Sequence, residues 1–109
     1  MTTVTFTLNA DNKIIGFKSE GHSGFARRGK DIVCASISVL TINTINSLEK
    51  IAHVETVVNT DAKTAAMECI LKDSPNVQTE TLFRSLELGV IGIHENYGSK
   101  YCNVIYKED

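Results

Sequence analysis

Apolar and polar residues alternate at the start of the chain, and this pattern predicts two strands. In the range 3–8, Val4, Phe6 and Leu8 alternate with threonines, which is the period of a half-buried strand. The Asn and Asp residues at 9–12 predict a turn, because these side chains bond their own main chain. A second strand is expected at 14–18, hairpinned to the first, and Gly16 inside it predicts a bulge or a close backbone approach.

The range 20–30 breaks this periodicity. It holds three glycines and three basic residues, Arg27, Arg28 and Lys30. Such a composition does not favour a helix or a strand, so we expect a mobile loop.

Helical spacing of apolar residues then predicts two long helices. The first covers about 32–52, with Asp31 as its N-cap and one apolar face made of Ile37, Leu40, Ile45, Leu48 and Ile51. The second begins at Ser74-Pro75 and runs to about Tyr97, with Gly98 as its stop. Gly89 and Gly92 in this helix predict close packing on the sheet.

Three further strand-like runs complete the pattern, at 54–59, 64–72 and 102–106. The order is ββαββαβ, which predicts an α+β fold of two layers, with a mixed sheet and both helices on one face. The length of 109 residues fits a single domain spanning 1–109.

Composition and charge narrow the function classes. The net charge of −2 does not supply the overall basic field that non-specific nucleic-acid binding needs, although a local patch could. No apolar run approaches about 18 residues, so no membrane-spanning helix is expected. The N-terminus has no signal-peptide pattern, and the three cysteines lie far apart, so we expect reduced thiols in the cytoplasm. Their spacing, and that of the histidines, predicts no metal site.

One pair of residues stands out as candidate chemistry, His22 and Cys34. The predicted helix starts just before Cys34, and a helix N-terminus favours a thiolate by about 0.3–1 kcal/mol. His22 lies twelve residues upstream in the predicted loop, which can fold back and place an imidazole beside the thiol. The N–H groups of Cys34 and its neighbours are candidates to hold an oxyanion. Asp31 orders the helix start, but as an anion it also opposes the thiolate.

A structural role is the alternative for each of these residues. Free cysteines are usually inert core, and Cys69 and Cys102 are expected there. Ser38, one turn after Cys34, either lines a site or bonds a helix carbonyl. His53 and His94 are expected to be solvated or to cap helices, and the basic residues of the loop to be solvated.

Two stretches resemble a known family: G-H-S-G at 21–24 and G-K-D-I-V-C-A-S-I-S at 29–38. Together with their spacing, the chain length and the element order, they resemble the ribosomal-processing cysteine proteases, called Prp or YsxB-like. The resemblance covers the whole chain. It departs from the family at Ser23, where alanine is common, and at Ser36, where alanine or glycine is common.

The resemblance implies a function and a site. The family's nucleophile falls on Cys34 and its general base on His22, while Gly21, Asp31 and Ser38 match supporting positions. Family members remove the N-terminal extension of large-subunit ribosomal protein twenty-seven, cutting after a short apolar, Phe-rich motif. They are homodimers with a flexible loop between the two catalytic residues, and no metal or organic cofactor is implied. No third residue that orients His22 is evident.

Two other classes stay open from the sequence. A non-catalytic, ribosome-associated binding module would use the same small fold without a reactive thiol. Another thiol hydrolase, or a redox sensor, would share a reactive Cys34 but not a specific peptide cleavage.

Overall fold

A computed structural model describes residues 1–27 and 29–109. The elements are β1 (Thr2–Leu8), β2 (Ile14–Glu20), α1 (Ile32–Lys50), β3 (Thr56–Asp61), β4 (Ala66–Leu71), α2 (Val77–Tyr97) and β5 (Cys102–Glu108). This order confirms the predicted ββαββαβ arrangement and the α+β class. The strands β2 and β5 extend further than predicted, whereas the turn between β3 and β4 lies at 62–65 rather than at 60–63.

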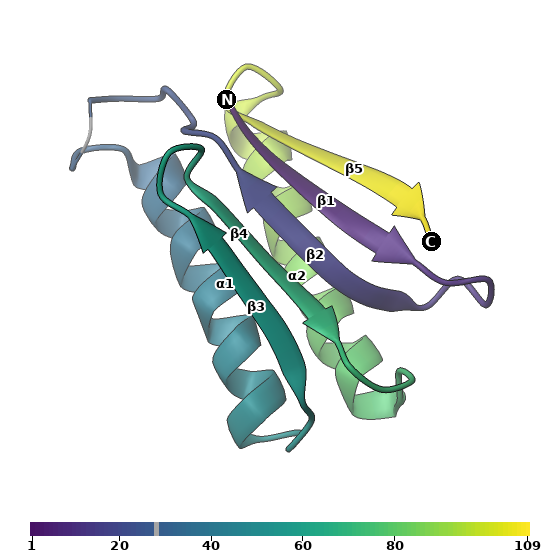
Figure 1. The fold of residues 1–109 in the computed structure, drawn as a ribbon. Helices are drawn as coiled ribbons and strands as arrows, with labels where there is room; N and C mark the ends of the chain where they lie inside the picture. The colour runs from purple at the N-terminus through teal and green to yellow at the C-terminus, as the bar shows by residue number, and fades with distance from the viewer. Residues whose placement is uncertain (28) are drawn as a thin grey trace.

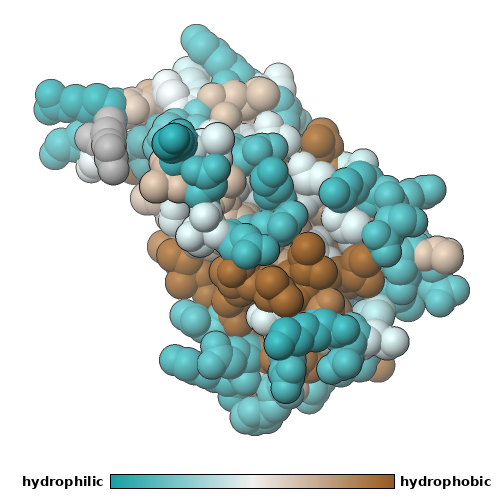
Figure 2. All heavy atoms as spheres, viewed as in Figure 1, coloured by the Kyte–Doolittle hydropathy of each residue, from teal (hydrophilic) through white to brown (hydrophobic). Residues whose placement is uncertain are grey.

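The five strands form one mixed sheet in the order β3-β4-β2-β1-β5. All neighbours are antiparallel except β1 and β5, which run parallel. Both helices cover the same face of the sheet, as predicted (Figure 1). The helix-free face carries an apolar band (Figure 2). Val57 and Ile70, which pair between β3 and β4, are exposed.

Gly16 lies where two strands approach closely. A Cβ atom at this position would lie 2.6 Å from the carbonyl oxygen of Cys69 on β4. The register between β1 and β2 also shifts beside it, between Thr7 and Leu8. Both features expected from a glycine inside a strand are therefore present.

The core lies between the sheet and the helices. Phe6, Phe17 and Phe83 are at most 1% exposed and contribute the largest buried side chains. Cys69 and Cys102 are fully buried, as predicted. Burial raises the pKa of the Cys69 thiol to about 11, with a hydrogen bond involving Thr56 opposing the shift, and burial also raises the pKa of Cys102. Both are unreactive core thiols.

The buried face of α1 is more polar than predicted. Thr41, Thr44 and Ser47 are buried, while Ile51 is 68% exposed, so its assignment to the apolar face was wrong. Thr41 and Thr44 satisfy their hydroxyl groups by donating to the carbonyls one turn earlier, at 2.9 and 2.8 Å. Because short hydroxyl side chains can bond their own helix, they occupy positions that a hydrophobicity pattern assigns to larger apolar residues.

The helix α2 begins later than predicted. Its N-cap is Asn76 rather than Ser74, because Asn76 and Thr79 form a reciprocal capping box. Gly89 packs against α1 rather than the sheet, since a Cβ there would lie 2.9 Å from Cδ1 of Leu40. The predicted packing of Gly89 on the sheet was therefore wrong.

The sequence predicted no membrane-spanning helix, and the apolar character of α1 differs from that expectation. Among the described residues, α1 has the length and composition of a membrane-crossing helix. Serines, threonines and asparagines interrupt its sequence, so no uninterrupted apolar run marks it. This resemblance to a membrane span is weak evidence by itself, because a core helix such as α1, with Val33, Ile37 and Leu48 buried, has the same length and composition.

Candidate active site

Asp31 fixes the start of α1, as predicted. It has extended backbone geometry, and its Oδ1 accepts the N–H of Cys34 at 3.0 Å. This bond occupies the amide of Cys34, which the sequence had offered as an oxyanion donor. In the structure that amide faces the capping carboxylate instead, so the expectation for Cys34 is corrected.

The second carboxylate oxygen of Asp31 binds the segment that leads into the helix. Its Oδ2 accepts the hydroxyl of Ser23 and the N–H of Phe25, the latter at 3.2 Å. Partial burial acts to raise the pKa of Asp31, but hydrogen bonds from Ser23 and from the main chain of Cys34, Phe25 and Ala26 outweigh it and lower the pKa to about 2. Asp31 is therefore ionised at neutral pH.

The sulfur of Cys34 lies against Ser23. The Ser23 N–H donates to Sγ at 3.1 Å, and the Ser23 Oγ lies 3.5 Å from the same sulfur. Cys34 itself is half-buried, in contrast to the two core cysteines. A thiol with partial access and a main-chain donor is the kind of environment in which cysteine reactivity is found.

A cavity of about 350 Å³ collects the predicted residues at the end of β2 and the start of α1. Its lining includes His22, Asp31, Cys34 and Ser38, so four of the five positions singled out from the sequence meet here. His22 is exposed, and no hydrogen bond joins its ring to Cys34 among the described residues. Ser38 lines the cavity, which favours the first of the two roles considered for it.

Gly21, the fifth position, acts from outside the cavity. Its φ is +87°, and a Cβ would collide with the carbonyl oxygen of Met1. Its N–H donates to the Thr64 carbonyl at 3.0 Å, and its carbonyl accepts the Thr2 hydroxyl at 3.3 Å. Next to it, the Met1 amino group donates to the His22 carbonyl. These contacts fix the main chain of His22 and explain why glycine occupies position 21.

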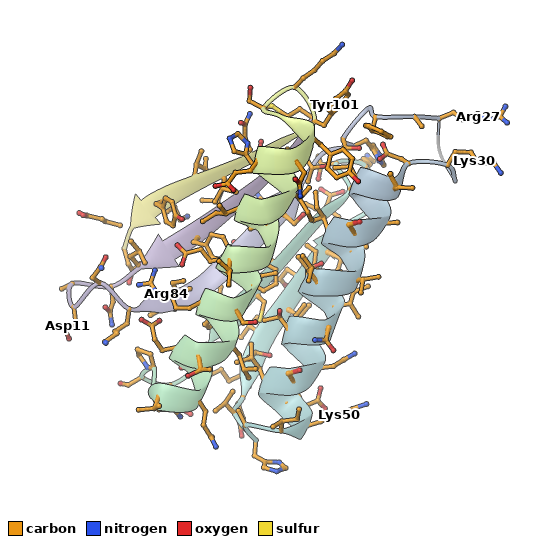
Figure 3. All side chains as sticks on the ribbon, turned by 180° about the vertical axis from the view of Figure 1, so that it is seen from behind. Asp11, Arg27, Lys30, Lys50, Arg84 and Tyr101 are labelled. Atoms are coloured by element: carbon orange, nitrogen blue, oxygen red, sulfur yellow. The ribbon has the colours of Figure 1, made fainter. Side chains whose placement is uncertain are left out.

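Phe25 attaches the same segment to the C-terminal end of α2, a contact that the sequence analysis missed. Its ring meets Tyr97 and Tyr101 edge-on, with centroid distances of 5.3 and 5.2 Å. Arg27 and Lys30 extend away from the helices at the outer tip of the segment, whereas Tyr101 lies near the end of α2 (Figure 3). Arg28, part of the basic run noted above, lies outside the described residues.

Ser23 is the other residue that the sequence analysis undervalued. It is 1% exposed and touches both Asp31 and Cys34, although the sequence marked it only as a departure from the family. The signal available in the sequence was a hydroxyl side chain directly after His22.

The other two histidines lie apart from this group. Nδ1 of His94 lies 2.6 Å from the Cys102 carbonyl, and His53 is exposed. Within residues 1–27 and 29–109, no three His, Cys, Asp or Glu side chains gather in a way that could hold a metal ion.

Comparisons with known proteins identify relatives of this chain. The chain is 24% identical over 97 residues to the ribosomal processing cysteine protease Prp of Staphylococcus aureus, covering 89% of this chain and 92% of that protein. It is 31% identical over 55 residues to the protein of the same name from Bacillus subtilis, about half of each chain.

Solved structures show the same fold. The crystal structure of S. aureus Prp with a covalently linked product peptide matches with a TM-score of 0.91 and 23% identity, covering 98% of this chain and 100% of that one. The structure of SMU.848 from Streptococcus mutans matches with a TM-score of 0.86 and 23% identity, covering 100% and 99% of the two chains. The family model for cysteine protease Prp matches residues 1–102. The chain therefore belongs to the Prp family of cysteine proteases.

Proposed function

We propose that this chain is a cysteine endopeptidase in which Cys34 is the nucleophile and His22 the general base and acid. The observation that carries the proposal is the shared cavity, in which the half-buried thiol at the start of α1 and the imidazole after β2 line one space. The ring of His22 has to come within hydrogen-bond distance of the sulfur when a peptide binds.

The reaction follows from these positions. His22 takes the proton of the Cys34 thiol, and the sulfur attacks the scissile carbonyl carbon. The tetrahedral oxyanion then collapses, the C–N bond breaks, and His22 gives its proton to the leaving amine. Water, activated by His22, hydrolyses the thioester and releases the new carboxylate. Because Asp31 occupies the Cys34 amide, we assign the Ser38 hydroxyl, one turn further along the cavity, as a donor to the oxyanion.

The substrate in this proposal is the precursor of large-subunit ribosomal protein twenty-seven. The protease removes its N-terminal extension after a short apolar, Phe-rich motif, a step in ribosome assembly. Family membership supports this choice, and so does the similarity to the ribosomal processing protease of S. aureus. The cavity, at about 350 Å³, has room for one large apolar side chain rather than for a folded domain.

The proposal places the protein in the cytoplasm as a homodimer that needs no metal or organic cofactor and binds neither nucleic acid nor membrane directly. The net charge of −2 supports the lack of nucleic-acid binding. Light scattering during size-exclusion chromatography tests the dimer. A monomer at micromolar concentration with full cleavage activity would remove the dimer from the proposal.

Peptide cleavage tests the catalytic roles. A peptide spanning the apolar extension is incubated with the wild type, Cys34→Ala or His22→Ala, and the products are weighed by mass spectrometry. We expect one cut by the wild type and at least about a 10³-fold loss in each variant. Cys69→Ala and His53→Asn serve as matched controls, because they remove a buried thiol and an exposed imidazole away from the cavity. Wild-type cleavage by Cys34→Ala would overturn the proposal.

The binding-module alternative makes the opposite prediction. If the protein only binds its partner, it should bind the extension peptide without cutting it.

A further inference from the structure

Ser23 occupies the centre of the hydrogen-bond network around the thiol. Its side chain is 1% exposed, and its hydroxyl lies between the Asp31 carboxylate and the Cys34 sulfur. Its main-chain N–H points at the same sulfur from 3.1 Å. One residue therefore presents two different polar groups to the nucleophile.

The direction of the hydroxyl hydrogen follows from the charge of Asp31. An ionised carboxylate only accepts hydrogen bonds, so the hydrogen between Ser23 Oγ and Asp31 Oδ2 belongs to Ser23. A serine hydroxyl has one hydrogen, which leaves only lone pairs of Oγ to face the sulfur at 3.5 Å. Lone pairs accept a hydrogen bond from a neutral thiol but repel a thiolate, whereas the Ser23 N–H favours the thiolate.

We propose that Ser23 is a positioning residue whose hydroxyl, held by Asp31, accepts the hydrogen of the Cys34 thiol and keeps this thiol protonated until His22 approaches it. This inference rests on the proposed role of Cys34 as nucleophile. It gives the resting site a thiol that is slow to oxidise or alkylate, because the thiolate is the reactive form.

Among residues 1–27 and 29–109, few other charged groups lie near this sulfur. His22 and Asp31 line its cavity, from the segment after β2 and from the cap of α1. Arg27 and Lys30 extend away from the helices (Figure 3). From the end of α2 and the turn before β5, Tyr97 and Tyr101 contact the intervening Phe25, and Lys100 lies over the Tyr101 ring. Ser23 and Asp31 are thus the groups whose removal should change the thiol most.

The first test is the pH dependence of alkylation. Iodoacetamide modification of Cys34 is followed from pH 5 to 10 without substrate, since Cys69 and Cys102 are fully buried. In Ser23→Ala, which keeps the main-chain N–H, we expect the midpoint to fall by about 0.5 pH unit and the rate at pH 7 to rise about 3-fold. Ser36→Ala is the matched control, because its hydroxyl bonds the Ile32 carbonyl on the same helix.

The second test asks whether Asp31 sets the direction in which the Ser23 hydroxyl hydrogen points. In Asp31→Asn, an amide nitrogen can donate to Ser23 Oγ, which frees the serine hydrogen to donate to the sulfur. In this background, adding Ser23→Ala should raise the midpoint rather than lower it. A reversal of sign is not expected if Ser23 only supports the fold.

The outcomes are distinct. The inference is overturned if the alkylation midpoint of Ser23→Ala stays at the wild-type value or rises. It is also overturned if Ser23→Ala shifts the midpoint in the same direction in the wild-type and Asp31→Asn backgrounds. Thiolate absorbance at 240 nm provides a second measurement if Ser23→Ala is less stable, because burial keeps the pKa of Cys69 near 11. Neither readout requires peptide cleavage, so failure of the proposed protease function leaves the inference testable on its own.

Discussion

The two helices of this protein begin in nearly the same way, and the difference between their starts locates the site. In α1 the cap Asp31 accepts the N–H of Cys34, and in α2 the cap Asn76 accepts the N–H of Thr79, at 3.0 and 2.9 Å. Cys34 and Thr79 both occupy the third helical position. In α2 the Thr79 hydroxyl accepts the N–H of Asn76 in return, so the cap is closed on itself.

In α1 the side chain of Cys34 does not bind the N–H of its cap Asp31 in return. Both residues bind Ser23 instead, which is more distant in the sequence. The sulfur of Cys34 accepts the N–H of Ser23, and the second oxygen of Asp31 accepts the hydroxyl of Ser23. In α2 this capping geometry thus stabilises only the helix itself, whereas in α1 it connects the helix to another chain segment. An open cap leaves the third-position side chain available for chemistry.

Removing each cap should separate these two roles most strongly. Asn76→Ala is expected to cost about 1 kcal/mol of unfolding free energy and to leave cleavage unchanged. Asp31→Ala should cost about 2–4 kcal/mol, because it also leaves the buried Ser23 hydroxyl without its acceptor. It should reduce peptide cleavage at least 10-fold. Urea unfolding and peptide cleavage measure the two effects, and equal losses of cleavage in both variants would contradict the comparison.

Gly21 lies just before Ser23, the residue that the α1 cap binds, and a variant at Gly21 tests this connection. Gly21→Ala should cost at least about 2 kcal/mol, since its backbone is left-handed and the added Cβ meets the Met1 carbonyl. Gly98 has a similar φ of +92°, but a Cβ added there would meet no atom within 4 Å, so Gly98→Ala provides a control for backbone strain alone. Thermal unfolding compares them, and equal shifts would show that the Met1 contact is unimportant.

Acid should affect the α1 cap and not the neutral cap of α2. The pKa of Asp31 is about 2 in the fold, below its ordinary value of 3.8, so the unfolded chain binds more protons between these values. The stability that Asp31 contributes is therefore fully present above about pH 5 and is lost as the pH falls towards 2. Urea unfolding between pH 5 and 2 should show a shallower loss in Asp31→Asn than in the wild type. Parallel curves would contradict this expectation.

A smaller effect than at Asp31 or Gly21 is expected at Phe25, which holds the far end of the segment. Phe25→Ala removes two edge-on aromatic contacts, with an expected cost of about 1–2 kcal/mol. Hydrogen exchange of the amides at 23–27 should accelerate, while the first turn of α2 is unaffected. Leu88→Ala, at a side chain that is 73% exposed on α2, is the control.

Local pattern was sufficient for the element order, the α1 cap and the positions of His22 and Cys34. It missed one local signal, the reciprocal Asn76–Thr79 cap that starts α2 later than Ser74. Its other failures lie where a contact joins distant residues, as between Gly89 and Leu40 on another helix. Ser23 and Phe25 had no periodicity to mark them, since their partners lie in the fold and not in the neighbouring sequence.

The parallel pairing of β1 with β5 has a consequence for timing. The Thr2 N–H donates to the Tyr101 carbonyl at 2.9 Å, and the pairing continues from Thr2 beside Cys102 to Leu8 beside Glu108. The same first residues support Gly21 and His22. During synthesis, a chain that already contains His22, Cys34 and β2, the antiparallel partner of β1, still lacks the parallel partner β5. The support that the first residues give to Gly21 and His22 is therefore expected to be complete only when β5 docks.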